Sequence, residues 1–123
     1  MALDKKYIEL FQKVSSRAAL ASYYLVGKKD KIAADKAAVD SMRQELNKID
    51  MNGQIVIGEG ELDKAPMLYI GEKLGTKKGP DFDIAVDPLE GTNFAAKNLP
   101  GAISVIAISN KNNLFNAPES YME

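Results

Sequence analysis

The chain has 123 residues, with 16 basic and 17 acidic side chains, and it contains no cysteine and no histidine. That length predicts one domain or part of one, and a hydrophobic share of 46% argues against a disordered chain. The balanced charge gives no reason to expect a nucleic acid or an anionic membrane as a partner. Disulfides, thiolate zinc sites and histidine bases are excluded. Any metal must therefore be held by oxygen atoms, and acid–base chemistry must use carboxylates, lysines, hydroxyl groups or metal-bound water.

No apolar run approaches the roughly 18 residues that a membrane-spanning helix needs. Residues 1–6 also lack the apolar stretch of a secretory signal. On these grounds we expect a cytoplasmic protein that has no membrane partner.

The first half of the chain has the spacing of two helices. Apolar side chains recur at three- and four-residue steps over residues 4–27, which predicts an amphipathic helix that ends near Gly27. Asp30 can cap a second helix with similar spacing, and this helix is predicted to run to about Lys48.

The pattern then changes to short runs rich in β-branched residues. They predict strands at residues 54–57, 82–86 and 102–109. The second strand is expected to stop at Asp87-Pro88, because proline cannot continue a central ladder of hydrogen bonds. Residues 66–74 fit a strand or a helix equally well.

Residues 110–113 have the composition of a hairpin turn, and residues 114–116 are expected to return beside the third strand. Two helices followed by a run of strands predict an α+β fold, with the helices packed on a mainly antiparallel sheet. Residues 120–123 carry no closing helix or loop. This end of the sequence is either a frayed terminus or a cut inside a larger domain, and the residues by themselves leave both alternatives open.

Acidic residues gather in the second half of the chain. Eight of the 17 lie between positions 59 and 90. Glu59 and Glu61 follow one predicted strand directly, and Asp87 follows another. Strand ends in helix-covered sheets open onto ligand crevices, and carboxylates that converge there repel each other unless a cation lies between them. Solvated loop acids are an equally ordinary explanation for Glu59 and Glu61.

The segment Asp87-Pro88-Leu89-Glu90-Gly91-Thr92 predicts a tight turn, because proline restricts the backbone and glycine permits angles closed to other residues. Such a turn would bring Asp87 and Glu90 to one side. If Gly91 and Thr92 open a short helix, their amide groups would point at an incoming anion. A carboxylate metal site beside an anion-binding helix start suits metal-assisted hydrolysis of a phosphate ester.

Asp35 lies on the same face as the apolar stripe of the second predicted helix. A lone carboxylate is costly to bury there, so it either reaches water at the helix edge or points into a site. Composition and spacing leave both alternatives open.

Three segments resemble the class II fructose-1,6-bisphosphatases of bacteria: residues 57–61 (Ile-Gly-Glu-Gly-Glu), 65–73 (Ala-Pro-Met-Leu-Tyr-Ile-Gly-Glu-Lys) and 83–92 (Asp-Ile-Ala-Val-Asp-Pro-Leu-Glu-Gly-Thr). Residues 30–35 and 116–123 match the same family, so the resemblance covers nearly the whole chain. The Asp-Pro-Leu-Glu-Gly-Thr part alone is similar to the wider superfamily of lithium-sensitive, magnesium-dependent phosphatases, which includes the inositol monophosphatases. The first two segments narrow the resemblance to class II.

The resemblance implies the layered sugar-phosphatase fold of the inositol monophosphatase type, with residues 1–123 as a single, truncated N-terminal phosphatase domain. It also implies Mg²⁺ or Mn²⁺ as cofactor, and hydrolysis of the 1-phosphate of fructose 1,6-bisphosphate to fructose 6-phosphate in gluconeogenesis. The metal ligands that it implies are Asp35, Glu59, Asp87, Glu90 and the main-chain carbonyl of Leu89. The catalytic residues that it implies are Asp35 and Thr92, which would activate the attacking water, together with Glu59. The substrate contacts that it implies are Gly91, Thr92 and Tyr121.

Two departures from the family pattern keep alternatives open. Family members are much longer, and their second half supplies a further metal ligand and most sugar contacts, so the chain could be a non-catalytic module that binds metal or phosphate. Asn93-Phe94 is similar to the inositol monophosphatase branch, which is a third possibility. Some relatives also accept sedoheptulose 1,7-bisphosphate. An open sheet edge in a partial fold predicts a homo-oligomer as well.

Overall fold

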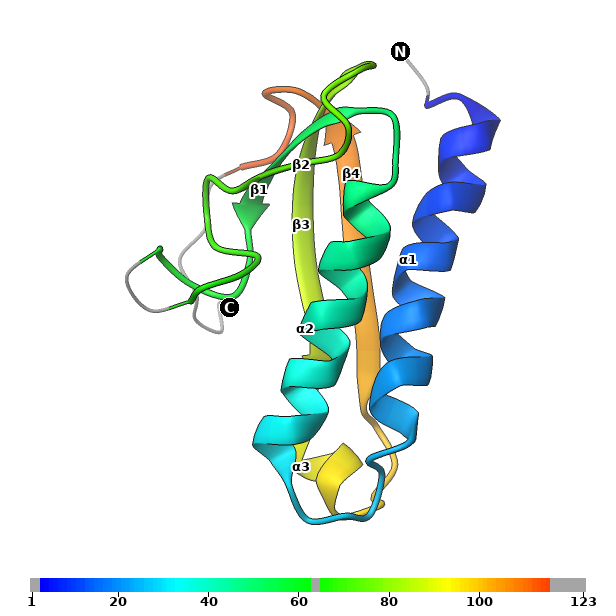
Figure 1. Cartoon of the computed structure of the whole chain (residues 1–123), viewed down its shortest axis with the longest axis vertical. Coiled ribbons are helices and arrows are strands. Elements are labelled where there is room, and N and C mark those ends of the chain that lie inside the picture. The colour runs from blue at the N-terminus through cyan, green and yellow to red at the C-terminus, as the bar shows by residue number, and fades with distance from the viewer. Residues whose placement is uncertain (1–2, 63–64, 116–123) are drawn as a thin grey trace.

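The computed structural model describes residues 3–62 and 65–115. Its elements, in chain order, are α1 (Lys5–Tyr23), α2 (Lys31–Asn47), β1 (Asn52–Ile57), β2 (Lys73–Leu74), β3 (Asp81–Glu90), α3 (Thr92–Ala96) and β4 (Ile103–Asn110) (Figure 1). The predicted α+β fold is confirmed, and the short helix α3 is added to the two predicted long ones.

Both long helices begin at aspartate caps. The Asp4 carboxylate accepts a hydrogen bond from the Lys6 N–H, and the Asp30 carboxylate accepts one from the Ala33 N–H at 3.0 Å, as predicted for Asp30. The first helix ends at Tyr23 rather than near Gly27. Gly27 has φ 75° and lies in the linker, where its N–H donates to the Ala95 carbonyl of α3 at 3.0 Å. This hydrogen bond attaches α3 to the segment that connects α1 and α2.

The four strands form one sheet in the order β2-β1-β3-β4. β1 pairs with β2 and β3 with β4 in antiparallel fashion, whereas the central pair β1–β3 is parallel. Two of the three pairings are thus antiparallel, in agreement with the mainly antiparallel sheet that was predicted. The ambiguity at residues 66–74 is resolved in part, because Lys73 and Leu74 form β2 and residues 65–71 form neither helix nor strand.

The second predicted strand does not stop at Asp87-Pro88. β3 continues through Pro88 to Glu90, and that expectation was wrong. The pairing with β1 ends at Ala85, so Pro88 lies where β3 has a neighbour on one side only. The register to β4 also shifts between Asp87 and Glu90. A missing N–H is tolerated at such an irregularity, whereas it would break a central ladder.

The turn predicted at residues 110–113 is present, with the Asn113 N–H donating to the Asn110 carbonyl at 3.2 Å. Residues 113–115 form no strand, so the predicted returning strand is absent over these positions. Residue 116, the end of that prediction, lies outside the described residues.

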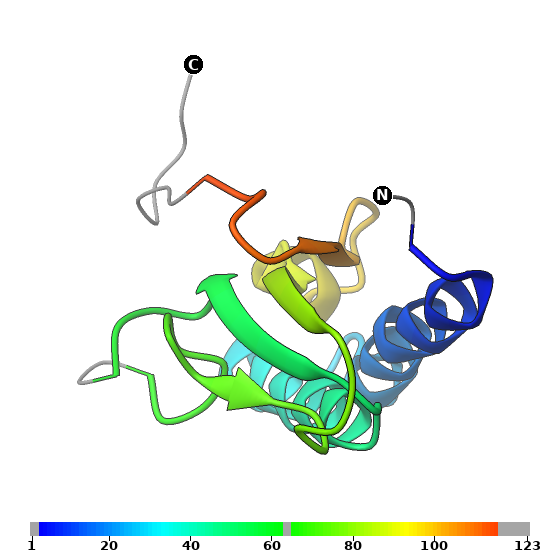
Figure 2. The same cartoon turned by 90° about the horizontal axis from the view of Figure 1, so that it is seen from above.

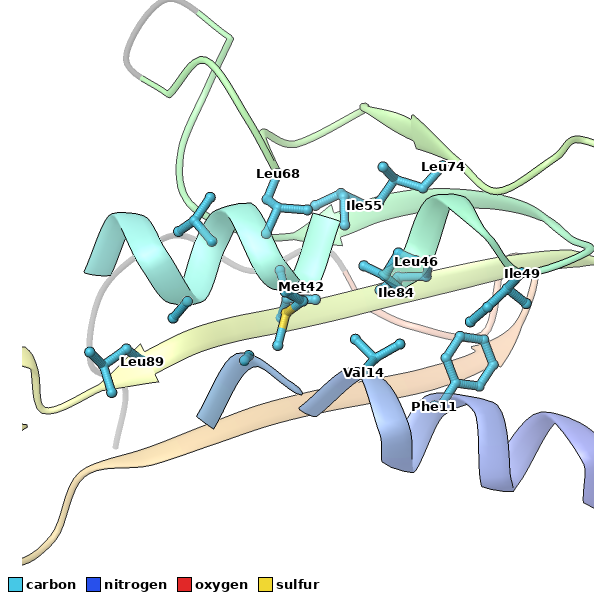
Figure 3. Close-up of a cluster of buried hydrophobic side chains, with 14 of the residues drawn as sticks. Phe11, Val14, Met42, Leu46, Ile49, Ile55, Leu68, Leu74, Ile84 and Leu89 are labelled. Carbon is cyan, nitrogen blue, oxygen red and sulfur yellow. The ribbon is translucent and has the colours of Figure 1, made fainter. Parts of the chain in front are cut away.

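The core lies between the helix pair and one face of the sheet (Figures 2 and 3). Met42 and Leu46 of α2 and Ile84 of β3 are fully buried at its centre. Phe82 packs edge-on against Tyr7 and Phe11 of α1, with ring centroids 5.1 and 5.9 Å apart. Burying these large side chains is the main force that holds α1 and α2 on the sheet. Over the described residues, no helix is long and apolar enough to cross a bilayer.

Candidate functional site

A bulge in β3 turns two carboxylates to the same side of the sheet. Asp87 pairs with Val105, and Glu90 pairs with Ile103. Three steps along β3 therefore match two steps along β4, which is the signature of one extra residue in a strand. Residues three apart in a regular strand point to opposite faces, so without the bulge Asp87 and Glu90 would point away from each other. The convergence predicted for this pair is present, and its cause is a bulged strand instead of a turn.

The two carboxylates interact directly. Burial, a side-chain hydrogen bond with Glu90 and the charge of Glu90 raise the pKa of Asp87 from its ordinary value of 3.8 to about 7. A backbone hydrogen bond from Leu89 opposes this shift. Two carboxylates hydrogen-bond to each other only when one of them holds a proton, so the pair shares a proton near neutral pH.

Asp35 reaches the same region from α2. Its side chain is half-buried, and burial raises its pKa. The charge of Asp35 also contributes to the raised pKa of Asp87. Asp35 therefore lies close enough to Asp87 for the two charges to interact, and its half-buried side chain still reaches the surface.

A groove of about 390 Å³ extends this region toward the loop after β1. Asp35 lines it together with Glu59, which follows the end of β1. The remaining lining residues are Ile32, Lys36, Val39, Ala65, Pro66 and Met67. The groove therefore has apolar walls with carboxylates from two separate elements, a composition typical of a ligand pocket.

The short helix considered for Gly91 and Thr92 is present as α3, which begins at Thr92 with Gly91 as its N-cap. Gly91 precedes the helix with φ 80° and ψ 48°, and its carbonyl accepts a hydrogen bond from the Ala95 N–H at 3.1 Å. The left-handed backbone angle favours glycine, because a β-carbon is strained there. Figure 1 shows α3 beside the N-terminal end of α2, the helix that carries Asp35. Leu89, whose carbonyl is an implied metal ligand, buries its side chain in the core.

The predicted metal ligands do not all lie together in one cluster. Across residues 3–62 and 65–115, no group of three or more acidic side chains is arranged as a metal site. Asp87 interacts with Glu90 and more remotely with Asp35, and Glu59 lines the same groove as Asp35. Tyr121 lies outside the described residues.

The chemistry of these donors nevertheless fits a hard divalent cation. Asp35, Glu59, Asp87 and Glu90 are carboxylates, and the implied ligand from Leu89 is a carbonyl. Oxygen donors of both kinds suit Mg²⁺ and Mn²⁺. The raised pKa of Asp87 reflects burial first, and then the repulsion from Glu90 that a proton neutralises. A cation that displaced this proton would remove the same repulsion.

The family model described as bacterial fructose-1,6-bisphosphatase, glpX-encoded, matches residues 5–123. The chain belongs to this family. The resemblance to the class II fructose-1,6-bisphosphatases is thereby confirmed over nearly its whole length.

Two curated relatives show how much of the family protein the chain represents. It is 51% identical over 121 residues to the D-fructose 1,6-bisphosphatase class 2/sedoheptulose 1,7-bisphosphatase of Prochlorococcus marinus (strain MIT 9303), a match that covers 98% of this chain and 36% of that protein. It is 53% identical over 113 residues to the fructose-1,6-bisphosphatase 1 class 2 of Escherichia coli (strain K12), covering 92% and 34%. The chain thus spans about a third of the length of these relatives.

A solved structure supports the fold. The extragenic suppressor from Pyrococcus furiosus superposes with a TM-score of 0.57 and 17% sequence identity, covering 87% of this chain and 41% of that one. At this level of identity the likeness concerns the fold alone.

The ion pair between Arg43 and Glu72 could not be predicted from local sequence patterns. Glu72 is buried and binds Arg43 of α2, which is 29 positions away. Glu72 stood out only as one of eight acidic residues, because nothing local marks an acid that will be buried.

Proposed function

We propose that this chain carries metal- and phosphate-binding residues for the hydrolysis of the 1-phosphate of fructose 1,6-bisphosphate, which yields fructose 6-phosphate. The observation that carries the proposal is the Asp87–Glu90 pair, which the bulge in β3 turns to one side. Burial, and then the interaction with Glu90, raise the pKa of Asp87 to about 7. Membership of the bisphosphatase family supports the choice of reaction and substrate. Because one relative is also named a sedoheptulose 1,7-bisphosphatase, that sugar is the first alternative substrate.

Mg²⁺ or Mn²⁺ would be held by Asp35, Glu59, Asp87, Glu90 and the Leu89 carbonyl. When bound, such ions lower the pKa of water and neutralise charge on the phosphate and the leaving oxygen. The shared groove and the mutual electrostatic effects of these carboxylates support their assignment to one site. Neither histidine nor cysteine is needed, in agreement with the composition.

The remaining roles are assigned to the residues around α3. Asp35, Thr92 and Glu59 would orient the attacking water and hold its proton. Gly91 and Thr92 would hold the phosphate through the backbone N–H groups at the start of α3, and Tyr121 would contact the sugar. The place of Gly91 and Thr92 at the start of α3, directly after Glu90 in the chain, supports the phosphate role, since backbone N–H groups at a helix start bind anions.

We further propose self-association and a cytoplasmic location. Ile103 and Val105 of β4 are 54% and 42% exposed, which is high for aliphatic residues in a strand. A second copy could cover them. The supply of sugar phosphates in the cytoplasm, where bacterial metabolic enzymes act, supports the location.

The decisive experiment measures Mn²⁺-dependent phosphate release from fructose 1,6-bisphosphate by the 123-residue chain and by its Asp87→Asn variant. Asp81→Asn is the matched control, because it makes the same change at the exposed opposite end of β3. Loss of release in Asp87→Asn but not in Asp81→Asn supports the proposal, and equal release from both contradicts the metal assignment. Mn²⁺ binding without release would identify a non-catalytic module. Inositol monophosphate is tested in parallel as a substrate, because its hydrolysis would indicate the third possibility, an inositol monophosphatase activity.

A further inference from the structure

We propose that the ion pair between Arg43 and Glu72 positions Glu59, acting through the backbone of Leu68. The inference rests on the proposed function, in which Glu59 is a metal-binding and catalytic residue. It concerns what holds Glu59 at a constant place relative to Asp35, which lines the same groove.

Glu72 is buried, and it uses both of its carboxylate oxygens. Only 5% of its side chain is exposed. One oxygen accepts a hydrogen bond from the Arg43 Nε at 2.9 Å, and the other accepts one from the Leu68 N–H at 2.6 Å. A buried carboxylate is retained in a fold only when it is paired in this way, so the side chain is held in one orientation.

Leu68 connects Glu72 to Glu59 through its backbone. Its φ is 55°, and its side chain is fully buried beside Ile55, as Figure 3 shows. The Leu68 carbonyl accepts a hydrogen bond from the Glu59 N–H at 2.9 Å. The Ile70 N–H donates to the Gly60 carbonyl at 2.8 Å, so the segment that carries Glu59 is bound on both sides of that residue.

The segment that contains Gly58 and Glu59 lies very close to the backbone of Leu68. A β-carbon on Gly58 would lie 2.2 Å from the Leu68 oxygen, which is far inside contact distance. This close approach and the hydrogen bond to Glu59 are therefore expected to transmit a displacement of the Leu68 peptide to Gly58-Glu59.

Arg43 connects this loop to the helix that carries Asp35. Both residues belong to α2, eight positions apart. The path from Asp35 to Glu59 thus runs along a rigid helix to Arg43, then through Glu72 and Leu68. Arg43, Glu72 and Leu68 do not line the groove, so this path is expected to hold Glu59 in place before a ligand binds. Supports of this kind around metal ligands commonly determine the affinity of a site.

The experiment uses the full chain and the variant Glu72→Gln, which keeps the shape of the side chain but loses its charge. Hydrogen exchange of the Glu59 amide is read first, without metal. We expect at least a tenfold loss of protection at Glu59, while amides in the central strand β3 exchange as in the wild type. Glu45→Gln is the matched control, because it removes a different α2 ion pair, that with Lys48.

The second readout is Mn²⁺ affinity in a double-mutant cycle with Glu59→Gln. If Glu72 acts through Glu59, then Glu72→Gln weakens Mn²⁺ binding about tenfold in the wild-type background and has no effect in the Glu59→Gln background. Additive losses in the double variant would show that Glu72 acts elsewhere and would overturn the proposal. So would wild-type protection of the Glu59 amide in a folded Glu72→Gln protein.

A second variant keeps the proposal testable if Glu72→Gln does not fold. Arg43→Lys keeps a cation opposite Glu72 but loses the Nε contact; the same loss of protection at Glu59 is expected, and unchanged protection overturns the proposal. If the wild-type chain binds no Mn²⁺, the proposed function fails, but the exchange of the Glu59 amide still decides whether the ion pair positions this residue.

Discussion

Binding of Mn²⁺ by this chain is expected to weaken steeply below neutral pH, because a proton competes for Asp87. The pKa of Asp87 is raised from 3.8 to about 7, chiefly by burial and then by Glu90. The proton that the two carboxylates share must leave before a cation can take its place. Competition with one proton of this pKa weakens the apparent affinity roughly tenfold at pH 6 and roughly 100-fold at pH 5, relative to pH 8. With the ordinary pKa of 3.8, the affinity at pH 5 would be almost unchanged.

The assay is calorimetric titration of the chain with Mn²⁺ at pH 5, 6, 7 and 8 and constant ionic strength. Repeating the titration at pH 6 in buffers of different ionisation enthalpy counts the protons released, and we expect about one per ion. Glu90→Gln removes the like charge, so it lowers the pKa of Asp87 and moves the pH dependence to lower pH. Asp81→Asn should leave the profile unchanged. A wild-type affinity that is the same at pH 5 and pH 8 would refute the reasoning.

Two further predictions concern stability. The pKa of Asp87 is higher in the folded protein than the unfolded value of 3.8, so its favourable contribution is complete below about pH 4 and is lost as the pH rises through 7. Metal-free Asp87→Asn should therefore be more stable than wild type at pH 8, by about 1 kcal/mol after allowance for partial solvent exposure, and urea unfolding curves that coincide at pH 8 would contradict this. Gly91→Ala and Gly71→Ala, at φ 80° and 94°, should each lower the free energy of unfolding by about 1 kcal/mol, since both place a β-carbon in left-handed backbone. Only Gly91→Ala should also reduce phosphate release, and a loss of release in Gly71→Ala as well would assign the effect to stability instead of phosphate binding.

Features that depend on neighbours in the chain could be predicted from the sequence. The two long helices follow from apolar side chains at three- and four-residue steps, and the cap at Asp30 is a contact with a residue three positions away. The absence of cysteine and histidine by itself limits the chemistry to oxygen ligands. The family motifs, such as Asp-Pro-Leu-Glu-Gly-Thr, are likewise continuous in the chain, so the resemblance is visible in the sequence alone.

Features that depend on distant contacts were decided by the tertiary structure alone. Pro88 remains within β3 because β1 has already ended beside Ala85, and the bulge that unites Asp87 with Glu90 exists only against the register of β4. Whether Asp35 reaches water or a site depended on what packs against α2. The pairing of Arg43 with Glu72 joins residues 29 positions apart, and no local pattern encodes it. Helix spacing and caps are short-range physics that a sequence displays directly, whereas strand register, burial and charge pairing arise only when separate segments meet in space.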